Sequence, residues 1–145
     1  MTLRQKFNAL AALFLLALAA MFAYLRWFEP PFLSYQGLPF KVSGPARPGE
    51  SVQLVVTRCN SSSSPQDYEL SHWLKNIDTG DPPVVLPAGL VPTIKPGCET
   101  GRSAMNVIPA GTPPGHYKIG GAGVAKGTLR TVNVDWYSEP FEVVP

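Results

Sequence analysis

The sequence is poor in the residues that usually carry enzyme chemistry. Its 145 residues include only two histidines, His72 and His116, and only two cysteines, Cys59 and Cys98. No Ser/His/Asp or Cys/His set is visible at short spacing, and the cysteines do not form a CxxC pair. We therefore expect no catalytic residues, no cofactor and no metal, and we interpret the protein as a non-enzyme.

Features that bind phosphate or nucleic acid are also missing. Three of the twelve basic residues lie before residue 28, which leaves nine basic against ten acidic residues beyond it. Such a balanced surface releases few counterions, so nucleic-acid binding is disfavoured. The glycines of GGAGVAKG, Gly120 to Gly127, have the spacing GxGxxxG with no helix expected after them. We interpret this segment as a flexible loop or a bulged strand.

Proline and glycine are absent from the first 28 residues and abundant afterwards. All sixteen prolines and thirteen glycines fall among the last 117 residues. Because these residues break helices and shape turns, we do not expect long helices there. We expect short strands separated by turns, and one domain with a core of its own.

An apolar run from Phe7 to Leu25 has Asn8 as its only strongly polar member. As a helix it would be about 28 Å long, close to the thickness of the hydrocarbon layer. We predict a transmembrane helix over residues 7–28 that contacts membrane lipid. Arg4 and Lys6 precede it, so the positive-inside rule makes residues 1–6 a cytoplasmic tail. The rest would lie outside the cytoplasmic (inner) membrane, in the periplasm or beyond.

The outer end of this run carries the residues that favour a membrane interface: Tyr24, Arg26, Trp27 and Phe28. Their presence favours a retained anchor. The alternative is a signal peptide, because Ala17-Leu18-Ala19 forms an A-x-A site after an apolar core, which would be cleaved after Ala19. Both interpretations stay open from the sequence.

Beyond the anchor, residues 29–39 (EPPFLSYQGLP) contain three prolines and suit a short, stiff stalk. Residues 40–145 then alternate between apolar and polar residues. The clearest strand is Ser51 to Cys59, in which Val52, Leu54 and Val56 share the face that should point inward. Met105 and Val107 are the expected core residues of a later strand.

Other segments follow the same pattern. Strands are expected at 40–43, 67–76, 84–86, 102–108, 116–119, 131–137 and 141–144, with a hairpin turn at Asp78 to Asp81. In the second of these strands, the buried face is ambiguous. His72 lies with two leucines on one face, and Trp73 lies on the other. Residues 87–96 hold too many prolines for a central strand and should cross between sheets.

Three segments resemble the immunoglobulin-like family: PGE before SVQLVVTRC, PAGTPPGHY, and the closing SEPFEVV. The resemblance implies a two-sheet antiparallel sandwich of about seven strands. On the oxidising side of a membrane, Cys59 and Cys98 favour a disulfide, with two separate buried thiols as the alternative. In a sandwich, the strand ending at Cys59 and the strand beginning after Cys98 would be antiparallel neighbours, with the bridge at the rim.

Two functions of different classes fit these observations. The first is a single-pass envelope protein whose domain contacts another protein, since exposed strand edges bind by strand addition. Its small single-module design suggests a phage or mobile-element origin. The second is a secreted or anchored module that binds glycan or copper. Trp73, Trp136 and Tyr137 are candidate stacking platforms for a glycan, although Trp136 shares a face with valines and is expected in the core.

Copper binding is suggested by one further likeness. The segment PAGTPPGHYKI is similar to the last hairpin of periplasmic copper-carrier sandwiches, and His72, His116 and Met105 are the ligands this implies. The other histidine motifs of that family are absent, so we expect no copper site. The oligomeric state is not indicated by the sequence.

Overall fold

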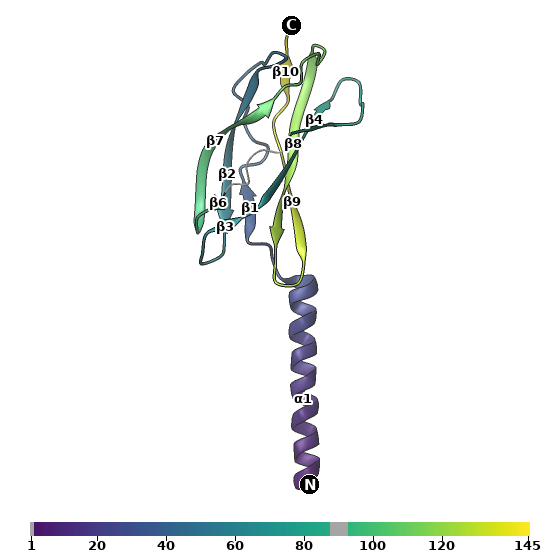
Figure 1. Ribbon diagram of the computed structural model, residues 1–145. Helices are drawn as coiled ribbons and strands as arrows, with labels where there is room; N and C mark the ends of the chain where they lie inside the picture. Colours follow the sequence, from purple (N-terminus) through teal and green to yellow (C-terminus); the bar gives the residue numbers. More distant parts are fainter. Residues whose placement is uncertain (1, 88–92) are drawn as a thin grey trace.

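The computed structural model describes residues 2–87 and 93–145, and the side chains at 104–106 lie outside the described set. One helix, α1 (Leu3–Ala23), continues as a π-helical turn, η1 (Tyr24–Phe28), and projects from one end of a β body (Figure 1). Its first turn is capped by Thr2, whose side chain and backbone exchange hydrogen bonds with Gln5 at 3.3 and 2.9 Å.

This helix contains none of the buried residues of the protein. Its most apolar stretch has a mean hydropathy of 2.1 and is 0% buried by the rest of the chain. By length and composition it is long and apolar enough to cross a membrane. The helix begins at Leu3, so residues 3–6 of the predicted cytoplasmic tail are its first turn.

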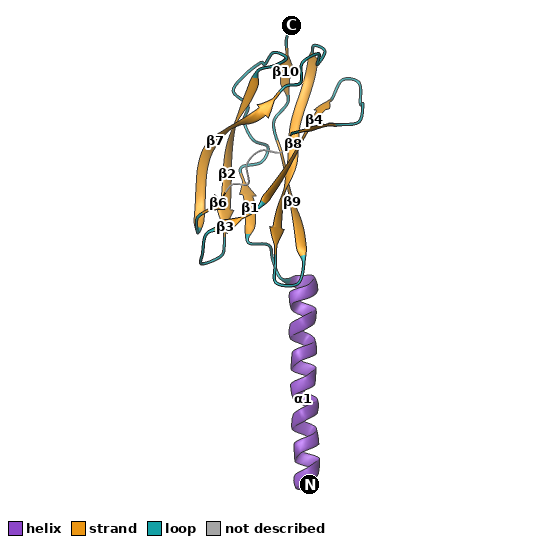
Figure 2. Cartoon of the chain, in the orientation of Figure 1, coloured by secondary structure: helices purple, strands orange, loops and turns teal. Residues whose placement is uncertain are grey.

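The β body is built from antiparallel sheets (Figure 2). A three-stranded sheet has the order β1-β2-β7, a five-stranded sheet has the order β10-β8-β4-β5 with β9 also paired to β8, and β3 pairs with β6. The strands are β1 (Leu33–Gln36), β2 (Ser51–Asn60), β3 (Gln66–Asp67), β4 (Glu69–Asn76), β5 (Val84–Leu86), β6 (Thr93–Ile94), β7 (Gly97–Val107), β8 (Gly115–Lys126), β9 (Thr131–Tyr137) and β10 (Phe141–Val143).

The main core draws its side chains from both large sheets. Leu54 of β2 and Ile119 of β8 are both 0% exposed and belong to the same apolar cluster. Trp136 of β9 and Val143 of β10 complete it from the five-stranded sheet. The apolar faces of the two sheets therefore bury one another, as the alternation of apolar residues in their strands requires.

Several predicted strands are confirmed. In β2, Val52 and Leu54 are buried while Gln53 and Val55 are exposed, as expected. A turn does follow β4, at residues 77–79 and so overlapping the predicted Asp78 to Asp81, and β4 pairs with β5 as a hairpin. In β4 the ambiguity is resolved: His72 is buried, and Trp73 lies half-buried on the outer face.

The predicted stalk, residues 29–39, is the first difference from expectation. Its centre forms β1, which pairs with β2 from Leu33 opposite Asn60 to Gln36 opposite Thr57. Leu33 is 0% exposed and anchors a second, smaller core. The prolines flank the strand instead of filling it, so the chain can make ladder hydrogen bonds between them. This segment belongs to the domain and is not a free stalk.

The glycine-rich segment is the second difference. We expected a loop or bulged strand, but Gly120 to Lys126 lie inside β8, paired with β4 on one side and with β9 on the other. Most of this stretch is buried. The glycines serve close packing, because bulky side chains of neighbouring strands lie directly over their backbone.

Two smaller expectations also fail. Val107 is 48% exposed and is not a core residue, whereas its neighbour Ile108 is fully buried. Met105 lies outside the described side chains. The strand expected at 40–43 is reduced to isolated bridges, from Phe40 to Ser138 and from Val42 to Leu54. Part of the predicted crossing segment, 88–92, falls outside the described residues.

Candidate interaction surfaces

The two cysteines face each other at one rim of the three-stranded sheet. Cys59 of β2 is register partner to Cys98 of β7, and their sulfurs are at disulfide distance, 2.05 Å. The expectation that these strands are antiparallel neighbours is confirmed. In the next register pair, Arg58 Nε donates to Glu99 Oε1 at 2.6 Å, and its Nη1 donates to Tyr68 Oη at 3.1 Å. Burial raises the pKa of the Tyr68 hydroxyl, which therefore stays protonated.

Strand β7 is an edge strand among the described strands, where it pairs only with β2. The Cα atoms of Cys59 and Cys98 are 4.0 Å apart, the close spacing of a non-hydrogen-bonded antiparallel pair. Because the two kinds of pair alternate, Thr100 and Arg102 occupy the same kind of position. Their backbone N–H groups therefore point away from β2, toward the open edge.

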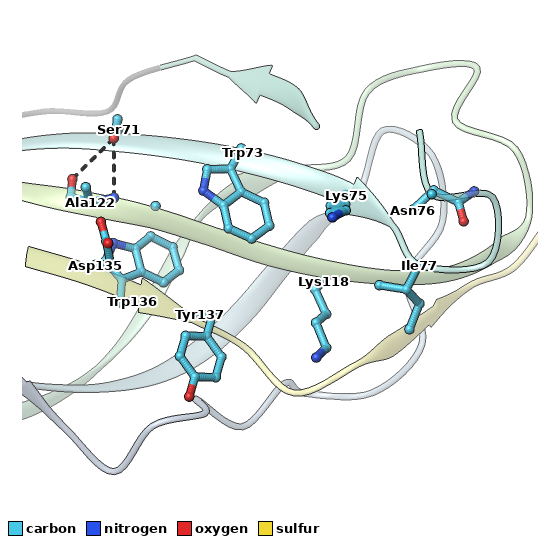
Figure 3. Close-up of a pocket in the computed structure, with 12 residues that line it drawn as sticks. Ser71, Trp73, Lys75, Asn76, Ile77, Lys118, Ala122, Asp135, Trp136 and Tyr137 are labelled. Carbon is cyan, nitrogen blue, oxygen red and sulfur yellow. Dashed lines mark hydrogen bonds between the residues drawn. The ribbon is translucent and has the colours of Figure 1, made fainter. Parts of the chain in front are cut away.

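The outer face of the five-stranded sheet carries a groove of about 620 Å³ (Figure 3). Trp73 of β4 and Tyr137 of β9 are register partners of Gly120 on its two sides, so the two rings flank a position without a side chain. A Cβ atom at Gly120 would lie 2.1 Å from the Trp73 ring, which shows how closely the indole covers the backbone. We call this surface the aromatic groove.

Charged side chains of both signs border the aromatic groove. Lys75 and Lys118 are register partners at one end. At the other end, Asp135 of β9 and Ser71 of β4 lie on the two sides of Ala122. The Ser71 hydroxyl hydrogen-bonds with Ala122 across the strands, as Figure 3 shows. The Tyr137 ring is 45% exposed, and charged side chains lie around it at the groove border. The aromatic groove therefore suits a ligand with both flat apolar and polar parts.

Trp136 does not belong to the exposed part of this surface. It is 5% exposed and packs in the core, with ring centroids 6.0 Å from Phe40 and 5.4 Å from His72. The expectation that Trp136 packs with the valine face is confirmed, and its use as a surface stacking platform is wrong. Of the three candidate aromatic residues, the structure brings together Trp73 and Tyr137.

The two histidines lie in different environments. His72 of β4 is 3% exposed in the core, opposite Gly121 of β8. His116 lies near the start of β8, five residues before Gly121. At the rise of an extended strand, about 16 Å separates these positions, so they cannot share one ion. The described residues contain no group of three His, Cys, Asp or Glu side chains that could hold a metal.

His116 instead contacts Asp78 of the β4–β5 turn. Its backbone N–H donates to Asp78 Oδ2 at 2.7 Å, and its Nδ1 lies 3.1 Å from the same oxygen. These contacts hold the pKa of the Asp78 carboxyl below its usual range. The pair fixes the start of β8 against the hairpin turn, which is a structural role.

The end of the helix is joined to the β body by the turn between β8 and β9. The Arg130 guanidinium donates to the carbonyl oxygen of Trp27 at 2.8 Å and also to that of Glu29. The Glu29 carboxylate accepts hydrogen bonds from the backbone N–H and the hydroxyl of Thr128, both at 2.9 Å. A cation at a helix C-terminus is favourable because it satisfies carbonyl groups that have no helical partner.

The four residues predicted at the membrane interface lie on this part of the helix. Tyr24, Trp27 and Phe28 are 53%, 61% and 72% exposed, and Arg26 is also exposed. Their place at a membrane interface stays a prediction. Sequence reasoning missed Arg130 and Glu29, because their contact joins positions about a hundred residues apart and no local pattern marks it.

Comparisons with known proteins give no family for this chain. No protein-family model matches it, and no curated protein matches it. Among solved structures, similarity was found to a Pseudomonas fluorescens alkylpurine DNA glycosylase AlkC bound to DNA containing an abasic site analog, with 14% identity and a TM-score of 0.47. The match covers 74% of this chain and 31% of the glycosylase.

A second similarity is to a β-glucosidase from Listeria innocua in complex with glucose, with 13% identity and a TM-score of 0.35. That match covers 81% of this chain and 17% of the glucosidase. The chain thus spans about a third or less of either protein. Both TM-scores are below 0.5, so neither likeness bears on what this chain does.

Proposed function

We propose that the chain is a non-enzymatic, single-pass envelope protein, anchored in the cytoplasmic membrane with its N-terminus inside. Its immunoglobulin-like domain would lie in the periplasm or outside the cell and bind another protein. The helix, which is apolar and unburied by the body, supports the anchor. The two facing antiparallel sheets support the sandwich class.

The open edge of β7 is the observation that carries the protein-binding role. It offers outward N–H groups at Thr100 and Arg102, next to a rim held by the cysteine pair. An edge fixed in this way can add a strand from a partner, which pairs by main-chain hydrogen bonds. Natural proteins usually cover or shorten such edges, so a long open edge favours a binding role.

Proline at position 102 tests this proposal. Arg102→Pro removes one outward N–H from β7 without removing a hydrogen bond to β2, so the edge strand should still form. We expect the domain to stay folded and its binding to the partner protein to be mostly lost. The measurement is photo-crosslinking in intact cells from a reactive amino acid placed at Thr100, followed by identification of the adduct.

Arg102→Gln is the matched control, because it removes the same charge and keeps the N–H group. It should retain the crosslinked adduct at the level of the unmodified chain. Equal loss in both variants would mean that the guanidinium matters and strand addition does not. Failure to find any adduct at Thr100 in cells would contradict binding at this edge.

A glycan is the second candidate ligand, favoured by the paired rings of Trp73 and Tyr137 around Gly120. Flat aromatic side chains on an open sheet face provide large contact area at low entropic cost. If the aromatic groove binds sugar, Trp73→Ala and Tyr137→Ala should each weaken binding by about tenfold or more. Isothermal titration calorimetry with soluble chitooligosaccharides measures this, because its readout does not depend on the tryptophan that Trp73→Ala removes.

Val55→Ala is the control for that titration. Val55 is 45% exposed on β2, in the other sheet, so its loss should leave sugar binding unchanged. No heat of binding from the native chain throughout the titration would remove these sugars as ligands. The protein-binding proposal at β7 does not depend on the outcome.

A further inference from the structure

The turn between β8 and β9 is placed at the same level as the end of the helix. Residues 127–130 form this turn, which Figure 1 shows beside the helix terminus at the base of the β body. Arg130 and Thr128 tie it to the carbonyl of Trp27 and to Glu29. If Trp27 lies at the lipid headgroups, the β8–β9 turn lies at the same depth in the membrane, because its hydrogen bonds to Trp27 and Glu29 hold it there.

Basic side chains gather around this turn. A hollow of about 730 Å³ is lined by Arg26 of the helix and by residues 126–131 of the β8–β9 hairpin. Lys126 is exposed and lies 3.4 Å from the Glu69 carboxylate, in a pair that solvent reaches on both sides. The three cations around this turn, Arg26, Lys126 and Arg130, outnumber the two carboxylates, Glu29 and Glu69, so the local net charge is positive by one.

An apolar residue lies at the tip of the same turn. Leu129 is 40% exposed, between Lys126 on one side and Arg130 on the other. An apolar tip flanked by cations is typical of segments that contact the boundary between headgroups and acyl chains. Arg26 and Lys126 would meet the phosphate groups while Leu129 reaches below them.

We propose that the β8–β9 turn is a second membrane contact, which binds the phosphate groups of anionic phospholipids through Arg26 and Lys126. This inference depends on the membrane anchor of the proposed function, and adds to it a lipid preference and a fixed orientation. Arg130 acts as a positioning residue, since it holds the turn against the helix end. The open edge of β7 is thereby presented at a set angle to the membrane.

The test uses the full chain in vesicles of phosphatidylcholine, with and without phosphatidylglycerol. An environment-sensitive fluorophore on Leu129→Cys reports contact with lipid through quenching by headgroup spin labels. We expect quenching to rise with phosphatidylglycerol and to fall again at high salt, because the attraction is screened. Removing both cations, in Arg26→Gln/Lys126→Gln, should weaken this contact by about fivefold for each charge.

The control is Lys75→Gln/Lys118→Gln, which removes the same charge from the aromatic groove. It should leave the quenching unchanged, and an equal loss there would overturn the assignment to Arg26 and Lys126. Flotation with the vesicles separates the two levels of the proposal. A chain that floats but shows no response to phosphatidylglycerol overturns the lipid site alone, whereas a chain that does not float, as after cleavage at Ala19, overturns the anchor and the lipid site together.

Discussion

Replacing Gly121 with alanine should destabilise the β body by about 3 kcal/mol. A Cβ atom at this position would lie 1.9 Å from the backbone carbonyl oxygen of Ser71 and 2.8 Å from the Trp136 ring. The carbonyl belongs to β4, the central neighbour of β8, and cannot move without disturbing the pairing of the two strands. Chemical denaturation of the full chain in detergent micelles, followed by tryptophan fluorescence, measures the loss.

Alanine substitutions at two other glycines of the sheets serve as controls for the cost expected at Gly121. Gly101→Ala in β7 should change the free energy of unfolding by less than about 0.5 kcal/mol, because nothing lies within 4 Å of its Cβ position. Gly120→Ala should fall between the two, since the three atoms nearest its Cβ position all belong to the Trp73 ring, a half-buried side chain that can turn away. Equal tolerance at 101 and 121 would contradict the close approach of β4 to β8.

The glycine strand also shows why sequence patterns find some strands and miss others. In β2 the alternation of apolar and polar side chains reports burial directly, so its position and inward face were predictable. In β8 the residues at 120, 121 and 123 have no side chain to report anything. Their cover is provided by Trp73, Trp136 and Leu33, which are distant in the sequence, and so only the folded chain reveals the strand.

Some features of the candidate surfaces can likewise be predicted from the sequence, and others cannot. The apolar helix and the facing cysteines follow from composition and from strand order, which are visible in the sequence. The aromatic groove cannot be predicted from the sequence, because the pattern of β4 allows Trp73 on either face. Its outward position depends on Gly120 of β8, which leaves room for the ring. The four-residue strand β1 was hidden by the prolines around it, and only Leu33 and Tyr35 point toward the cores. The aromatic groove and β1 depend on contacts between residues far apart in the sequence, which local periodicity does not reveal.

Removing the cysteine pair, in Cys59→Ala/Cys98→Ala, should lower the free energy of unfolding by about 3 to 4 kcal/mol in the chain-entropy view. The pair closes a loop with a sequence separation of 39, and its loss frees that loop in the unfolded chain. The unmodified chain should lose a similar amount when a reductant is added. The double variant should show no further response to the reductant, and denaturation with and without it measures both.

The neighbouring pair Thr57 and Thr100 separates the effect of the bridge from that of the strands. Their hydroxyls are 2.9 Å apart on the same two strands, and Thr57→Ala/Thr100→Ala should cost less than about 1 kcal/mol. If both double variants lost the same amount, the bridge would add nothing beyond ordinary cross-strand contact. Because β7 pairs only with β2 among the described strands, loss of the bridge should also loosen the open edge at Arg102. Crosslinking from Thr100 should then weaken in the cysteine variant, which joins the stability of this rim to the binding role we propose for it.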